Sequence, residues 1–122
     1  MRIDQPYSRC CGPIIKGVTH ATSAEKLMRS RYSAYVMAAV DYLIETTHVS
    51  KRADLSKKEI ENWAKTNVWL ELKIIRADTF MVEFKAYFKD KSGRKQIHHE
   101  KSAFVYENER WYYLDGIFNE DI

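Results

Sequence analysis

The chain has 122 residues, a length that fits one domain able to bury about two thirds of its unfolded surface. Its 20 basic and 17 acidic residues are too evenly mixed for the basic stripe of a nucleic-acid-binding protein. The sequence shows no apolar run long enough to span a membrane and no signal peptide. We therefore expect a cytoplasmic protein with neither nucleic acid nor membrane as a partner.

Residues 1–21 form an irregular segment whose one reactive feature is the adjacent pair Cys10 and Cys11. Glycines and prolines interrupt any periodicity there. Structural zinc takes four ligands, so two thiolates supply half a metal site. We expect no cofactor, with zinc possible only if further ligands come from outside this chain. The alternative is two small, partly buried thiols without metal.

A helix is predicted over residues 23–39, with Thr22 and Glu25 as a capping box that sets its phase. At about 100° per residue, Arg31 falls on the apolar side of this helix, roughly 40° from both Leu27 and Tyr35, and Tyr32 lies on the same arc. A guanidinium keeps its charge, so inside a core it needs a carboxylate or a wet cavity.

Two interpretations of Arg31 stay open. It forms a structural ion pair, or its stem packs while its head reaches solvent. Alternatively it binds an anion in a pocket that Tyr32 and Tyr35 help to line. Arg29, on the same helix, is a second candidate cation for the site.

Two further helices and four strands are predicted downstream. Asp41 is a plausible N-cap for a helix over residues 42–47, and Ser56 with Glu59 forms a capping box for a third helix. The hydrophobic period then changes from helical to two, which is typical of strands. The predicted strands cover about residues 68–74, 80–89, 95–106 and 111–118. Short connections predict an antiparallel meander with three helices on one face, an α+β domain.

The last two strands carry the polar candidates for an interior site. Alternation places Glu100 and Ser102 on one face with Phe104, and we expect that face to meet the helices. On the last strand the residues expected to face the core are Trp111, Tyr113, Asp115 and Ile117. Glu100 and Asp115 are therefore candidate carboxylate partners of Arg31. His98 and His99 are neighbours on a strand and face opposite sides, so they cannot chelate one ion together.

The chain resembles the YchJ family of small bacterial proteins over nearly its whole length. The residues that carry the resemblance are CCGP (10–13), TSAEKLMRSRYSAYV (22–36), DYL (41–43), HEKSAF (99–104) and RWYYLDG (110–116). The resemblance implies that residues 22–122 form a domain like nuclear transport factor two (NTF2-like). Such a domain is a cone-like roll in which a curved antiparallel sheet and helices enclose a cavity, and it is often a homodimer.

The resemblance also implies an interpretation of residues 1–21. In the family a SEC-C motif, a small zinc-binding knuckle, precedes the domain, and PYSRCC (6–11) is similar to its second half. We interpret this segment as the remnant of such a motif, with the Cys-x-Cys half expected before Met1.

Three functions remain open at this point. The first is a non-catalytic binding module whose cavity holds an unknown small ligand. Its candidate binding residues are Arg29, Arg31, Tyr32, Tyr35, Glu100, Ser102, Trp111, Tyr113 and Asp115. The second is an adaptor that binds a protein partner through the SEC-C remnant. The third, by fold analogy alone, is a small isomerase or dehydratase with Glu100 or Asp115 as its base.

Overall fold

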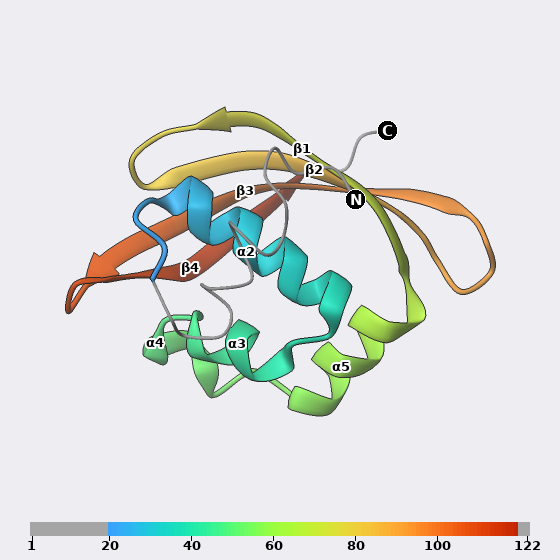
Figure 1. The fold of residues 1–122 in the computed structure, drawn as a ribbon, viewed down its shortest axis with the longest axis horizontal. Coiled ribbons are helices and arrows are strands. Elements are labelled where there is room, and N and C mark those ends of the chain that lie inside the picture. Colours follow the sequence, from blue (N-terminus) through green and yellow to red (C-terminus); the bar gives the residue numbers. More distant parts are fainter. Residues whose placement is uncertain (1–19, 120–122) are drawn as a thin grey trace.

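The structure is a computed structural model, and it describes residues 20–119. Helices precede strands along the chain, and Figure 1 shows the helices together on one side of a curved sheet. The helices are α2 (Ala24–Met37), α3 (Val40–Glu45), α4 (Val49–Arg52) and α5 (Lys57–Thr66). The strands are β1 (Val68–Ala77), β2 (Met81–Lys89), β3 (Lys95–Glu107) and β4 (Arg110–Asn119). The α+β prediction is therefore confirmed, whereas Cys10 and Cys11 lie outside the described residues.

Helix α2 begins and ends slightly inside its predicted bounds. Its N-cap is Ser23, whose hydroxyl accepts a hydrogen bond from the backbone N–H of Lys26, so the prediction of Thr22 was wrong. The helix ends because Ala38 adopts a left-handed conformation with φ of 55°. Its backbone N–H then bonds to carbonyls of the last turn, a common way to terminate a helix.

The structure contains one helix more in the described residues than the three that were predicted. The additional helix is the single turn α4, whose N-cap is the imidazole of His48. Helix α3 begins at Val40, so Asp41 lies inside its first turn and is not its cap. The predicted cap of α5 is confirmed, because the Ser56 hydroxyl accepts from the backbone N–H of Glu59. Within the described part of the chain, every helix is too short or too polar to cross a membrane.

The four strands form one antiparallel sheet in sequence order, as predicted. Alternation in the sequence predicts that Val68, Leu70, Leu72 and Ile74 share one face of β1. This prediction was partly wrong, because the strand has register shifts at Leu70 and Ile75. Each shift turns the following residues over. Trp69 therefore shares the helix-covered face with Leu72, whereas Val68 is exposed.

The hydrophobic core lies between α2 and the helix-covered face of the sheet. Among its most deeply buried side chains are Leu27, Tyr32, Leu43, Val82 and Phe104. Five polar or charged residues of α2 and β3 are fully or almost fully buried. These are Ser30, Arg31, Ser33, Glu100 and Ser102. A core that contains a cation and a carboxylate must satisfy both of them locally.

Candidate functional site

A cavity of about 420 Å³ lies between the helices and the sheet. Its lining includes residues from all four described helices and all four strands, so every described helix and strand helps to shape it. The volume is within the range of sites for small molecules. Most of the lining is apolar or aromatic, and its charged groups fall into two sets. Arg31 and Glu100 are buried inside, whereas Lys51, Asp54 and Asp115 are exposed at the mouth.

Arg31 is 6 % exposed, as the phase of α2 predicted. Its Nη1 donates to the carbonyl oxygen of Leu43 at 2.9 Å and to the hydroxyls of Thr46 at 2.7 Å and Thr47 at 3.3 Å. Leu43 lies in the last turn of α3, where carbonyls have no partner within the helix and carry partial negative charge. Arg31 therefore binds the C-terminal end of α3. The prediction of a carboxylate partner was wrong, since no acid in the described residues lies within ion-pair distance of Arg31.

Glu100 is buried on β3 and binds three donors of its own. Its Oε2 accepts from the hydroxyls of Ser102 at 2.5 Å and Tyr113 at 2.8 Å, and its Oε1 lies 2.8 Å from Nε2 of His98. Burial raises the pKa of the Glu100 carboxyl, but the hydrogen bonds from His98, Ser102 and Tyr113 outweigh burial. The net pKa is lower than usual, so Glu100 is a carboxylate at neutral pH.

Tyr113 connects the two buried charges. Its hydroxyl donates to Glu100, and Cζ of Arg31 lies 4.6 Å from the centre of its ring. Cation–π attraction is favourable at this distance. Burial and the adjacent Glu100 charge both raise the pKa of the Tyr113 phenol strongly, so it stays protonated and remains a donor. The cation and the carboxylate are therefore coupled through one aromatic ring and do not touch.

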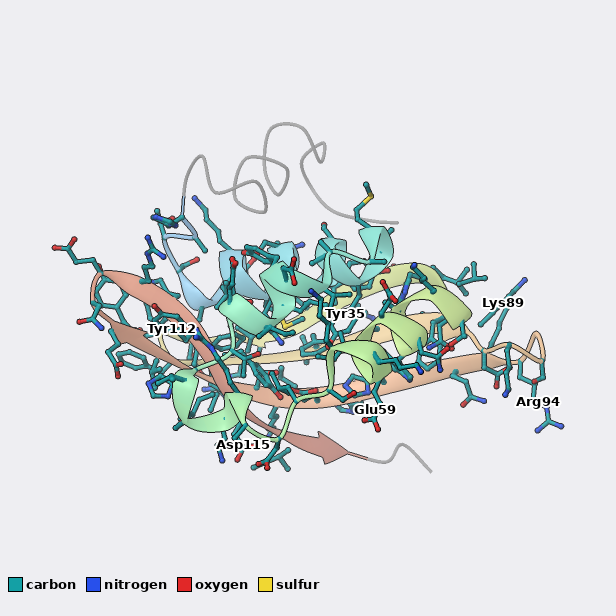
Figure 2. All side chains as sticks on the ribbon, turned by 90° about the horizontal axis from the view of Figure 1, so that it is seen from below. Tyr35, Glu59, Lys89, Arg94, Tyr112 and Asp115 are labelled. Carbon is teal, nitrogen blue, oxygen red and sulfur yellow. The ribbon has the colours of Figure 1, made fainter. Side chains whose placement is uncertain are left out.

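An aromatic wall formed by Tyr35, Trp63 and Trp69 closes another side of the cavity. The ring centres lie 4.8 Å apart for Trp63 and Trp69, and 5.6 Å and 5.7 Å from Tyr35 to each of them. The indole N–H of Trp69 donates to the carbonyl of Ala64, which fixes that ring. Figure 2 shows Tyr35 reaching from α2 toward α5, the helix that carries Trp63.

Tyr32 is the most deeply buried tyrosine of the cavity lining. Burial, with a smaller contribution from the charge of Glu71, raises the pKa of its phenol to about 12. Its hydroxyl is the one enclosed side-chain polar atom in the described residues that has no hydrogen-bond partner. Such a group is costly to bury, so the described contacts leave this donor unsatisfied.

Most of the residues singled out from the sequence meet at this cavity. Those that line it are Arg31, Tyr32, Tyr35, Glu100, Ser102, Tyr113 and Asp115. Arg29 and Trp111 lie elsewhere. Arg29 forms an ion pair with Glu25 one turn earlier on α2, and Trp111 packs against Phe80 and Tyr106 near the end of the sheet.

The inward orientation predicted for Asp115 was wrong. Strand β4 has a register shift at Leu114, so Ala103 pairs with Asp115 and Phe104 pairs with Tyr113. The additional residue turns Asp115 away from the core, and its side chain is 71 % exposed. It lies beside α4, as Figure 2 shows, 3.8 Å from Nζ of Lys51. Ile117 is turned outward by the same shift.

Gly116 occupies the inward position that the shift in β4 vacates. It pairs with Ser102, and a Cβ atom there would overlap Oε2 of Glu100 and lie 2.6 Å from the hydroxyl of Tyr113. The absence of a side chain at this position is therefore what gives the Glu100 carboxylate its room.

Sequence reasoning missed several residues of the site. His98 lies two positions before Glu100 and shares its face, so extending the alternation of β3 backward would have identified it. Trp63 lies on α5 and was not connected with a site. Trp69 could not have been found by alternation, because the register shift in β1 reverses its orientation.

The lowered pKa of Glu100 predicts a specific dependence of stability on pH. A group whose pKa is lower in the folded state contributes stability above its unfolded pKa of about 4.3, and that contribution is lost as the pH falls through the folded value. Glu100 faces His98 and Tyr113, and Arg31 lies behind the Tyr113 ring. The wild-type free energy of unfolding should therefore fall below about pH 4.5 more steeply than that of Glu100→Gln.

Urea denaturation between about pH 3 and about pH 7 measures this difference. Glu109→Gln, in the exposed turn between β3 and β4, is the matched control and should retain the wild-type slope. Equal acid slopes for the wild type and Glu100→Gln would show that the carboxylate is not stabilised in the folded state.

The arrangement of helices and strands indicates the class of the protein. A meander of four antiparallel strands with helices on one face is consistent with an NTF2-like domain. Residues 23–116 match the family described as YchJ, middle NTF2-like domain. The chain belongs to this family, whose curated members carry the name UPF0225.

Relatives and solved structures agree with this assignment. A UPF0225 protein of Geobacter sulfurreducens is 40 % identical over 117 residues, covering 90 % of this chain and 72 % of the relative. A solution structure of a SEC-C motif containing protein from Rhodopseudomonas palustris has a TM-score of 0.88 at 34 % identity, covering 97 % of this chain and 95 % of that one. A crystal structure of a SEC-C motif containing protein from Psychrobacter arcticus has a TM-score of 0.77 at 32 % identity, covering 100 % and 79 %.

Proposed function

We propose that this chain is a non-catalytic binding module and that its cone-like enclosure holds a small organic ligand. The observation that carries the proposal is a cavity of about 420 Å³ with a buried guanidinium and an aromatic wall on its surface. Pockets that bind small molecules combine apolar walls with a few placed polar groups. Arg31 and the aromatic wall supply these two elements.

The state of the two candidate bases favours binding over catalysis. A general base in this cavity needs a carboxylate that can accept a proton from a substrate. Both oxygens of Glu100 already accept hydrogen bonds, and its lowered pKa makes it a weak base. Asp115 is exposed at the mouth beside Lys51.

The experiment uses a pair of alanines on opposite faces of the sheet. Ala86 is buried and lines the cavity, whereas Ala103 is exposed on the other face. Ala86→Leu should fill part of the cavity, and Ala103→Leu should leave it unchanged. NMR titration of the wild type with a library of small organic fragments should shift resonances of cavity residues. The affinity of these fragments should fall at least about tenfold in Ala86→Leu only.

Thermal unfolding of both variants controls for stability, because overpacking a core costs about 1–3 kcal/mol. Two results would refute the proposal. One is that no fragment binds to the wild type, and the other is that the bound fragments retain their affinity in a folded Ala86→Leu variant.

A further inference from the structure

The hydrogen bonds of Arg31 leave one edge of its guanidinium without an acceptor. All three acceptors, on Leu43, Thr46 and Thr47, bind Nη1. A guanidinium has five N–H groups, and the three on Nε and Nη2 have no protein acceptor in the described residues. Neither atom is enclosed, since the Tyr32 hydroxyl is the one enclosed unpartnered polar atom of residues 20–119. The Nε and Nη2 edge is therefore the part of the guanidinium that is left for a ligand in the cavity that Arg31 lines.

The interior offers a ligand more donors than acceptors. Glu100 accepts from His98, Ser102 and Tyr113, so most of its acceptor capacity is in use. The free edge of Arg31 presents parallel N–H groups in a fixed fork. Carboxylates accept such a fork in a bidentate manner, and these bonds are stronger than neutral hydrogen bonds. The group that fits this end of the cavity is therefore a carboxylate.

The aromatic wall lies one helical turn from Arg31. Tyr35 follows Arg31 by four residues on α2, which corresponds to a rise of about 6 Å. Its ring contacts Trp63 and Trp69, and these three rings touch one another rather than surrounding a gap. The ring planes are inclined to one another by 43° to 82°, so the wall presents both ring faces and ring edges. Because the rings leave no gap for a cation between them, the wall favours an aromatic group in edge-to-face or offset contact with it.

From these two surfaces we infer that the ligand is a small aryl carboxylate, with its acid on the free edge of Arg31 and its ring on the wall of Tyr35, Trp63 and Trp69. This inference rests on the proposed binding function and adds the chemical class of the ligand. A phosphate is a poorer fit, because phosphate sites usually combine several donors, including backbone N–H groups, whereas Arg31 is the single buried cation among the described residues that line the cavity.

The test uses the full chain and four matched probes with calorimetry. Phenylpropionate presents the acid and the ring, and phenylpropionamide replaces the acid by a neutral amide. Cyclohexylpropionate replaces the aromatic ring, and phenyl phosphate replaces the carboxylate. Phenylpropionate should bind at least about tenfold more tightly than each of the other three. In NMR spectra of arginine side chains, it should shift the Nε–H resonance of Arg31, and the amide should not.

A variant pair tests the role of the fork. Arg31→Lys keeps the charge but loses the planar fork, so phenylpropionate should bind at least about tenfold more weakly. Arg29→Lys on the same helix is the control and should leave binding unchanged. Because Arg31→Lys can lose stability, its fold is checked by circular dichroism, and the four-probe comparison does not depend on it.

The outcomes separate the ligand class from the binding function. Equal binding of acid and amide, equal binding of the cyclohexyl probe, or tighter binding of phenyl phosphate would overturn the class. The class would also be overturned if none of the four probes bound while other fragments bound to the wild type and lost affinity in Ala86→Leu. In that case the proposed binding function would still stand. If no fragment of any chemistry binds, the proposed function itself fails.

Discussion

Replacing Arg31 by methionine should lower the free energy of unfolding by about 2–4 kcal/mol. The change removes charge-assisted hydrogen bonds to the end of α3 and the cation–π contact with Tyr113. The ring of Tyr113, whose hydroxyl donates to buried Glu100, then has lost its cationic neighbour. Methionine is flexible enough to occupy the remaining space, so the loss reports the polar contacts more than a cavity.

Arg29→Met provides a matched control on the same helix. Arg29 forms an ion pair with Glu25 along the same helix, and the exposed fractions of the two side chains are 18 % and 41 %. Ion pairs that solvent reaches contribute up to about 1 kcal/mol. Urea denaturation of both variants at neutral pH measures the difference. Similar losses for the two variants, or a more stable Arg31→Met protein, would contradict the structural role assigned to Arg31.

Gly116→Ala should also lower the free energy of unfolding, by about 2–4 kcal/mol. The new methyl group would overlap Oε2 of Glu100 and lie 2.5 Å from its Cδ and 2.6 Å from the Tyr113 hydroxyl. Glu100 is 5 % exposed and bound by three donors, so it cannot move aside without breaking buried hydrogen bonds.

A double-mutant cycle tests the cause of this effect. In a Glu100→Ala background the overlapping carboxylate is absent, so Gly116→Ala should cost at least about 1 kcal/mol less than it does in the wild type. Chemical denaturation of the four proteins measures the coupling. Strictly additive losses would mean that the glycine is required for a reason unrelated to Glu100.

Regular periodicity was sufficient to predict the class of the fold. The phase of α2 predicted a buried Arg31, and the alternation of β3 predicted that Glu100 and Ser102 would share an inward face. In α2 and β3 each residue adds the same rotation or the same change of face, so the spacing of residues in the sequence predicts which side of the element they occupy. The meander followed from the short connections between strands.

The wrong predictions of side-chain orientation occur in the strands that contain an additional residue, because there the inward and outward positions no longer alternate regularly. The register shifts at Leu70 and Leu114 reverse the faces of β1 and β4, which is why Trp69 was missed and Asp115 was placed inside. Neither shift has a glycine or proline that would have indicated it. The partner of Arg31 was wrong for another reason. Hydrogen bonds to the end of α3 depend on how two helices pack, and a residue pattern does not contain that information.

The register shift at Leu114 also fixes how many negative charges the interior contains. In a regular β4, Asp115 would occupy the inward position that Gly116 now fills, directly beside Glu100. Two carboxylates would then lie side by side in the interior, and each would raise the pKa of the other. The additional residue in β4 thus limits the buried acidic groups of the described interior to one carboxylate, because it places Asp115 opposite Ala103 and Gly116 opposite Ser102. A change of register between Tyr113 and Gly116 that turned Asp115 inward should accordingly be far less tolerated than substitutions at the exposed positions of this strand.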